Sequence, residues 1–203
     1  MMNDKTAIVC YINFFIGGVI MTRKITFVAM FAALTAVGAF IRIPFYPVPF
    51  TLQFLFCCLS GLLLGARLGA LSQFVYVALG LVGLPIYAKG YGGLNYVFEP
   101  TFGYLLGFII CSYVTGLLFE KMKQANFVKT LTVTLVGMLL LYVPGVTYMY
   151  YILNFYIPGK SIALTVALTQ GFFVFIPSGI ILCILSSMIA LKVKPTLTRI
   201  FNN

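Results

Sequence analysis

The feature that most limits how this chain can fold is a series of long stretches with no charged residue. An α-helix needs about 17–25 apolar residues to cross the hydrocarbon core of a bilayer. Of the 203 residues, 62% are hydrophobic and only 8% are charged. The sequence therefore predicts an all-α integral membrane protein with six transmembrane helices, one for each charge-free run at 25–41, 43–66, 68–88, 100–119, 130–159 and 161–191.

A β-barrel does not fit this pattern, because barrel strands alternate apolar and polar residues over segments of about ten residues. The runs here are apolar on every face. The last run is too long for one simple span, and Pro177 divides it. Since proline is tolerated in the first turn of a helix, we expect a short outer helix at 161–175 and a final span from Pro177 to about Leu191.

Lysine and arginine residues are unevenly distributed between the two sides of the predicted bundle. If the N-terminus of the first span is cytoplasmic, the outer side receives only Arg42, Lys89 and Lys160 of the 13 cations. Cytoplasmic loops of membrane proteins carry an excess of such residues. We therefore expect a multi-pass protein of the cell membrane, with the N-terminus of its main body cytoplasmic and the loops at 42–50 and 83–100 outside.

Residues 1–20 precede a second methionine, Met21, which two cations follow closely. The stretch is apolar but short, and no A-x-A-like cleavage site precedes Met21. We predict an upstream extension or signal-like segment at 1–20, with a seventh span as the alternative, and a single six-helix membrane domain at 21–203.

The side chains on which most enzymes depend are scarce. The chain has no histidine, and its acidic residues are Asp4, Glu99 and Glu120. These residues cannot supply a His-based triad, a pair of catalytic carboxylates or a metal site, and the five cysteines form no C-x-x-C pair. The cations lie at the ends of apolar runs and not in a basic patch. We expect no enzyme activity, cofactor, metal or nucleic-acid partner.

Hydrogen-bonding groups and aromatic rings gather in the predicted outer loops and at the outer helix ends. Such a mixture suits a small, partly apolar ligand held by a few polar groups, although tyrosines at this depth are also typical of an interfacial aromatic belt. From this set we predict that the substrate-binding residues include Gln53, Tyr87, Lys89, Tyr91, Asn95 and Tyr104.

The first predicted span carries alanines at helical spacing, Ala29, Ala33 and Ala36. Small residues let helices approach closely in lipid, so this face either docks a partner helix or packs within the bundle. We expect the spaced glycines of the later spans, such as Gly103 and Gly107, to pack within the bundle.

Two stretches of the chain resemble the BioY family, the biotin-specific substrate-binding (S) components of energy-coupling-factor (ECF) transporters. The first lies at 47–108 and contains in succession VP-x-TLQ, G-x-LLG, GL-x-GLP, GG and PT-x-GYL-x-GF; the second is FIPSG at 175–179. The resemblance covers the chain from Met21 to about Lys194.

This resemblance implies a six-helix S component that captures biotin from outside with high affinity. It would work with an ECF transmembrane coupling protein and a pair of ABC-type ATPases, and the alanine face would meet the coupling protein. The resemblance also implies that the outer first loop closes over the substrate, and it adds Gly92, Gly93, Ser178 and Gly179 to the predicted substrate site.

The chain departs from the family at charged positions. The family's last span commonly reads F-I-P-G-D-x-x-K, which supplies an acid for the ureido group of biotin and a lysine for its carboxylate. Here Gly179 stands at the acid's position and Leu182 at the lysine's, and Tyr91 replaces a polar residue of the glycine-rich loop. Since losing a buried charge partner costs a few kcal/mol of affinity, we expect a cation of the outer face, Lys89 first, to receive a carboxylate.

Two alternatives to a biotin S component stay open on the sequence. One is an S component for a related acid, such as lipoate or a biotin precursor. The other is a non-transporting membrane scaffold, for which the lost charges would be natural.

Overall fold

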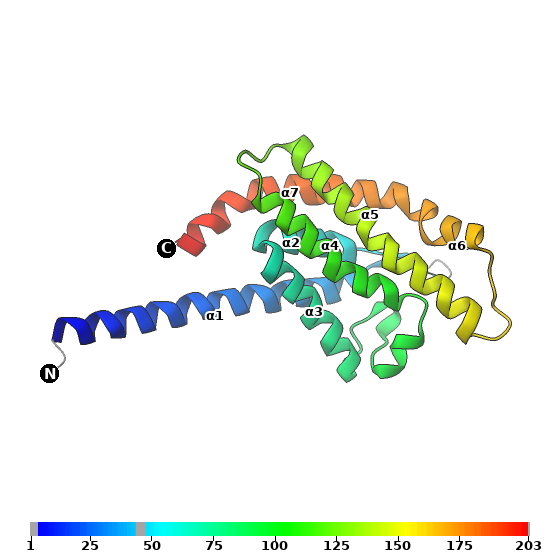
Figure 1. Cartoon of the computed structure of the whole chain (residues 1–203), viewed down its shortest axis with the longest axis horizontal. Helices are drawn as coiled ribbons and strands as arrows, with labels where there is room; N and C mark the ends of the chain where they lie inside the picture. Colours follow the sequence, from blue (N-terminus) through cyan, green and yellow to red (C-terminus); the bar gives the residue numbers. More distant parts are fainter. Residues whose placement is uncertain (1–3, 44–47, 203) are drawn as a thin grey trace.

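The computed structural model describes residues 4–43 and 48–202, and it describes side chains at 21–43 and 48–196. These residues form a bundle of long helices in which α4 packs against α2, α3 and α5 (Figure 1). The all-α prediction is confirmed. The α-helices are α1 Asp4–Phe40, α2 Gln53–Leu64, α3 Ala66–Val82, α4 Phe102–Glu120, α5 Phe127–Tyr151, α6 Leu164–Gly171 and α7 Ile176–Asn202.

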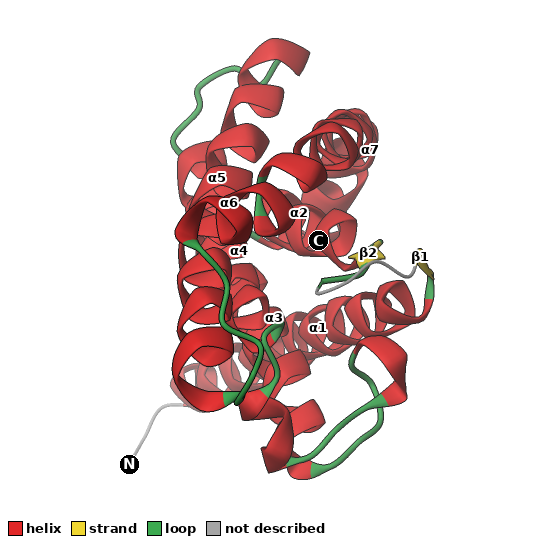
Figure 2. Ribbon diagram, turned by 90° about the vertical axis from the view of Figure 1, so that its right-hand side faces the viewer, coloured by secondary structure: helices red, strands yellow, loops and turns green. Residues whose placement is uncertain are grey.

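Short elements connect the helices at the end of the bundle where α2 begins. Two strands form an antiparallel hairpin beside the C-terminal end of α1 (Figure 2). The other short elements are helical turns in the connections before α4, α6 and α7. The bounds are β1 Arg42–Ile43, β2 Phe50–Thr51, η1 Ala88–Gly90, η2 Leu94–Phe98, η3 Ile152–Tyr156 and η4 Phe173–Phe175.

Four helical segments of the described chain are long and apolar enough to cross a membrane, at Met21–Phe40, Phe102–Glu120, Phe127–Tyr156 and Leu164–Thr196. The protein is therefore a multi-pass membrane protein. Helices α2 and α3 occupy the second and third predicted spans but are shorter. The start of the second run belongs to the hairpin, and Pro49, just before β2, could not continue a helix.

The last charge-free run and the N-terminal segment of the chain had also been given predicted boundaries. The last run divides into α6 and α7 as expected, with Pro177 in the first turn of α7. Residues 4–20 continue α1 without a break, and Figure 1 shows this N-terminal part running beyond the other helices. The boundary at residue 20 stays a prediction. Pro44 and Pro47 lie outside the described residues.

A polar cluster joins four helices inside the bundle. The Gln73 Nε2 atom of α3 donates to Thr35 Oγ1 of α1 at 3.2 Å and to Ser60 Oγ of α2 at 3.1 Å. Ser60 Oγ in turn lies 2.8 Å from Ser112 Oγ of α4. All four side chains are completely buried. Such hydrogen bonds stabilise helix contacts in lipid, where no water competes for them.

Charged side chains secure the link between α2 and α3, at the end of the bundle away from the hairpin. Gly65 has a φ of +85° there and separates the two helices. Glu120 Oε1 accepts a hydrogen bond from the Ala66 N–H at 3.1 Å, and Lys194 Nζ donates to the Leu62 carbonyl at 2.8 Å. The acid thus meets a helix N-terminus and the cation a helix C-terminus, which are the favourable pairings with the helix dipole.

Candidate functional site

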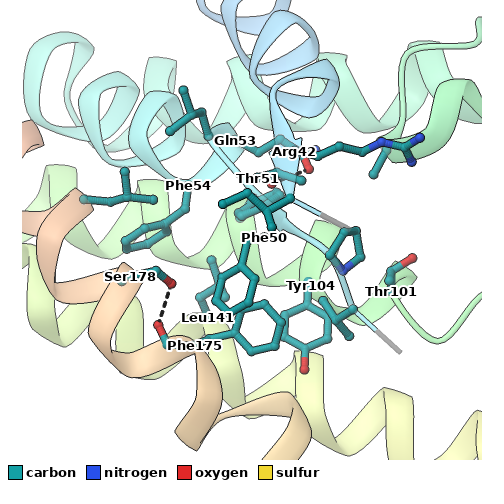
Figure 3. Close-up of a pocket in the computed structure, with 18 of the residues that line it drawn as sticks. Arg42, Phe50, Thr51, Gln53, Phe54, Thr101, Tyr104, Leu141, Phe175 and Ser178 are labelled. Carbon is teal, nitrogen blue, oxygen red and sulfur yellow. Dashed lines mark hydrogen bonds between the residues drawn. The ribbon is translucent and has the colours of Figure 1, made fainter. Parts of the chain in front are cut away.

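A cavity of about 340 Å³ lies beneath the hairpin. Its wall comes from the hairpin, the first turns of α2 and α4, the middle of α5 and the first turns of α7 (Figure 3). Its volume is at the lower end of the range for small-molecule sites, about 300–1,000 Å³. Apolar residues dominate the wall, among them Val48, Phe50, Phe54, Leu105, Phe108, Leu141, Phe175, Ile181 and Leu182.

The hairpin is fixed over the cavity by backbone and ring contacts. Its register pairs Arg42 with Thr51 and Ile43 with Phe50. The Phe50 ring packs on Phe175, just before α7, with 4.3 Å between the ring centroids (Figure 3). At the hairpin's end the Leu52 N–H donates to the Gly38 carbonyl at 3.1 Å. The hairpin thus bridges the end of α1 and the start of α7.

Gln53 lines the cavity and belongs to a chain of hydrogen bonds. The Thr51 hydroxyl donates to Gln53 Oε1 at 2.9 Å, and Gln53 Nε2 donates to the Tyr76 hydroxyl at 2.6 Å. Tyr76 then donates to the Ile86 carbonyl at 3.2 Å. This chain of hydrogen bonds fixes the Gln53 amide at the cavity wall.

The hydroxyl groups of the cavity wall also have partners within the protein. The Tyr104 hydroxyl donates to the Gly171 carbonyl at 2.9 Å, and Ser178 Oγ donates to the Phe175 carbonyl at 3.0 Å. Tyr96 and Thr101 share a hydrogen bond of 2.8 Å. Burial raises the pKa of Tyr96 to about 12, so its phenol is neutral in the physiological range.

The structure divides the predicted substrate residues into two groups. Gln53, Tyr104, Ser178 and Gly179 meet at the cavity wall. Tyr87 is buried next to it, with its hydroxyl donating to the Val77 carbonyl and its ring 4.4 Å from that of Tyr96.

The remaining predicted residues belong to the connection between α3 and α4 and do not line this cavity. The Lys89, Tyr91 and Asn95 side chains are exposed. Gly93, with a φ of +96°, donates its N–H to the Gly80 carbonyl at 2.7 Å, and a Cβ on Gly92 would collide with the Leu84 carbonyl. These two glycines fold the loop back onto the end of α3.

Most residues of the cavity wall were absent from the sequence-based site, and Arg42, Ala88 and Tyr96 are among them. Arg42 had been noted only as a nearby cation. A sequence signal for it existed, because Arg42 is two residues before the first proline of the hairpin that was expected to cover the substrate.

The α7 positions at which the resemblance would call for an acid and a lysine both face the cavity. Gly179 and Leu182 of α7 are part of its wall. A Cβ on Gly179 would lie 2.6 Å from the Met138 sulfur of α5, so α7 approaches α5 closely at this point. None of the described α7 residues that line the cavity is charged.

The predicted docking alanines lie on an outward face of α1. Ala29 and Ala33 are exposed and Ala36 is half-buried, whereas Ala32 and Ala39 face the interior. Among the residues that the structure describes, no three His, Cys, Asp or Glu side chains are grouped as metal ligands would be.

Comparison with known proteins identifies the family. The BioY family model matches residues 4–199. The chain is 46% identical to the probable biotin transporter BioY of Lysinibacillus sphaericus over 140 residues, 69% of this chain and 71% of that protein. It is 40% identical to the biotin transporter BioY of Thermotoga maritima over 172 residues, 85% of this chain and 96% of that protein.

A solved structure agrees with this result. The S-component for biotin from an ECF-type ABC transporter superposes with a TM-score of 0.76 and 27% sequence identity, covering 86% of this chain and 92% of that one. A family model that matches nearly the whole chain, relatives with high identity and a shared fold all agree, and the chain belongs to the BioY family.

Proposed function

We propose that the protein is the biotin-binding S component of an ECF-type uptake transporter. The observation that carries this proposal is the 40% identity to a biotin transporter over nearly that protein's whole length. The cavity supports it, because a small apolar space with a few fixed polar groups suits a vitamin-sized acid. Biotin is the ligand named for the relatives and for the structural neighbour.

The wider assembly follows from the same proposal. The neighbour's description places it in an ECF-type ABC transporter, and on this basis the partners here are a transmembrane coupling protein and ABC-type ATPases. The exposed alanines Ala29 and Ala33, with Ala36 beside them, form the docking face for the coupling protein. Their exposure in the free chain supports this role.

We place the protein in the cell membrane, with the hairpin and the cavity on the outer side. Positive residues support this orientation, because most of them lie at the other side of the bundle. Gln53, Tyr104, Ser178 and Gly179 contact the ligand, since all four line the cavity. Roles for Tyr87, Lys89, Tyr91, Gly92, Gly93 and Asn95 stay predictions.

The test is equilibrium binding of labelled biotin to the purified, detergent-solubilised protein. We expect saturable binding that unlabelled biotin displaces, with dethiobiotin and lipoate as weaker competitors. A Gln53→Leu variant removes the polar amide at the cavity wall, and we expect weaker binding by about 1–3 kcal/mol, the range for a lost hydrogen bond in a buried site. Stronger displacement by lipoate than by biotin would move the assignment to another acid. Absence of saturable binding for all three ligands would favour a scaffold.

A further inference from the structure

The charges at the cavity wall are unequally distributed. Most of the wall is made of carbon, and its polar groups are hydroxyls and one amide. Arg42 is the single charged residue among the described residues that line the cavity, and no described acid lines it. A ligand with a positive charge would find no partner there, whereas an anion would find one.

Among the described polar side chains of this wall, Arg42 has all of its donors free. Within the described part of the chain, no hydrogen bond or ion pair joins its guanidinium to another residue. The polar groups around it are engaged, since Thr51 donates to Gln53, Gln53 donates to Tyr76 and Tyr104 donates to the Gly171 carbonyl. A guanidinium offers five N–H donors in a fork that matches a carboxylate.

The hairpin determines where the Arg42 side chain begins. Arg42 is directly opposite Thr51 in the antiparallel register, and side chains of directly paired residues lie on the same face of a strand pair. Arg42 therefore starts beside the Thr51 and Gln53 pair, at the cavity wall. Figure 3 shows the Arg42 side chain extending away from the Phe50 and Phe175 rings.

We propose that Arg42 binds the carboxylate of the ligand at the cavity wall, while the uncharged body of the ligand lies against the phenylalanines. The inference rests on the proposed function and adds to it the residue that selects a monoanionic ligand. Arg42 is exposed, and exposed ion pairs are weak. The bond gains strength because the ligand's body and the hairpin shield one side of it and because the fork bonds both carboxylate oxygens.

The test compares biotin with its methyl ester, which keeps the body of the molecule and removes the charge. Wild-type protein should bind biotin roughly tenfold more tightly than the ester. Arg42→Gln should bind the two ligands equally, with the loss confined to biotin. Comparing the ratio between variants cancels every contribution that does not depend on both the arginine and the carboxylate.

Three further variants make the test specific. Arg67→Gln makes the same chemical change at an exposed residue of α3 that does not line the cavity, and it should keep the wild-type preference. Arg42→Lys keeps a positive charge and should retain part of the preference. Leu182→Lys in the Arg42→Gln background places a cation at another position of the wall and should restore a preference for biotin over the ester.

The possible outcomes separate this inference from the proposed function. If wild-type protein binds biotin and Arg42→Gln keeps the full preference over the ester, the role of Arg42 is refuted while the transport assignment stands. The same conclusion follows if Lys89→Met, and not Arg42→Gln, removes the preference. If wild-type protein binds neither ligand, the proposed function fails and this inference fails with it.

Discussion

Helices α4 and α1 both carry small residues at helical spacing, but the two sets meet different surroundings. The glycines of α4 are buried against other helices of the chain. A Cβ on Gly107 would lie 2.5 Å from the Leu141 carbonyl of α5, and one on Gly116 would collide with the backbone that links α2 to α3. On α1, by contrast, Ala29 and Ala33 are exposed.

This difference shows that a pattern of small residues in a membrane helix indicates a close helix contact but does not identify the partner. In lipid, apolar side chains gain little by leaving their solvent, and small residues matter because they let backbones come close. On α4 the chain itself supplies the neighbouring backbone. At Ala29 and Ala33 of α1 the described residues leave the pattern exposed, and we propose that it serves another protein.

The largest expected effect is a loss of stability on substitution of a buried glycine of α4. Gly107→Leu puts a side chain where the α5 backbone already lies, and a backbone cannot move aside as a flexible side chain does. We expect a loss of about 4 kcal/mol or more, comparable with the whole stability of many proteins. Size-exclusion chromatography in detergent should show aggregated or absent protein. Leu106→Ala, at the exposed neighbouring residue, should elute as wild type.

The next effect concerns the alanine face. Ala33→Leu adds a large side chain to an exposed position, so we expect the coupling module to be lost on co-purification while biotin affinity is unchanged. Ala163→Leu makes the same change at an exposed residue before α6 and should leave both properties as in wild type. A simultaneous loss of biotin binding and co-purification in Ala33→Leu would mean that the alanines pack within the bundle.

A neighbouring residue sharpens the contrast within one helix. Ala32 is 4% exposed and belongs to the core, whereas Ala33 is exposed. Ala32→Leu overfills the core, and we expect a loss of about 1–3 kcal/mol in the free energy of unfolding. Thermal unfolding of the two leucine variants should show a lower midpoint for Ala32→Leu alone. Equal midpoints would remove the distinction between the two faces.

The sequence predicted the membrane helices because long charge-free runs have one physical solution, a helix in lipid. Two spans were predicted too long because periodicity does not show where a backbone turns. Pro49 precedes β2 in the second run, and Gly83, with a φ of +118°, ends α3 in the third. Prolines and glycines signalled these turns, but the pattern did not say how many residues each would take from a helix.

The candidate site was predictable where the side chains belong to helices. Gln53 and Tyr104 line the cavity because each is in the first turns of a helix whose direction the spans determine, whereas Ser178 was predicted through the family resemblance. The loop residues were harder to place. Lys89 has a φ of +75° and is exposed, and no periodic pattern indicates which way a residue in an irregular segment points. Arg42 reaches the cavity wall because it pairs with Thr51 on the other strand of the hairpin. A pattern along the sequence does not show this pairing.

The smallest expected effect concerns the contact between α2 and α4 and which interaction stabilises it. Gly61 of α2 faces the backbone of Ser112 on α4, so that a Cβ there would collide with the Ser112 carbonyl. The two helices also share the hydrogen bond between Ser60 and Ser112. Ser112→Ala removes this bond and leaves the close approach in place, and the Ser60 hydroxyl keeps the Cys57 carbonyl at 2.7 Å as a partner. Hydrogen bonds between membrane helices average about 0.6 kcal/mol, so the thermal midpoint should fall only slightly and biotin affinity should stay the same. A fall as large as that of Ala32→Leu would show that the polar cluster, and not the fit of glycine against backbone, dominates the contact between α2 and α4.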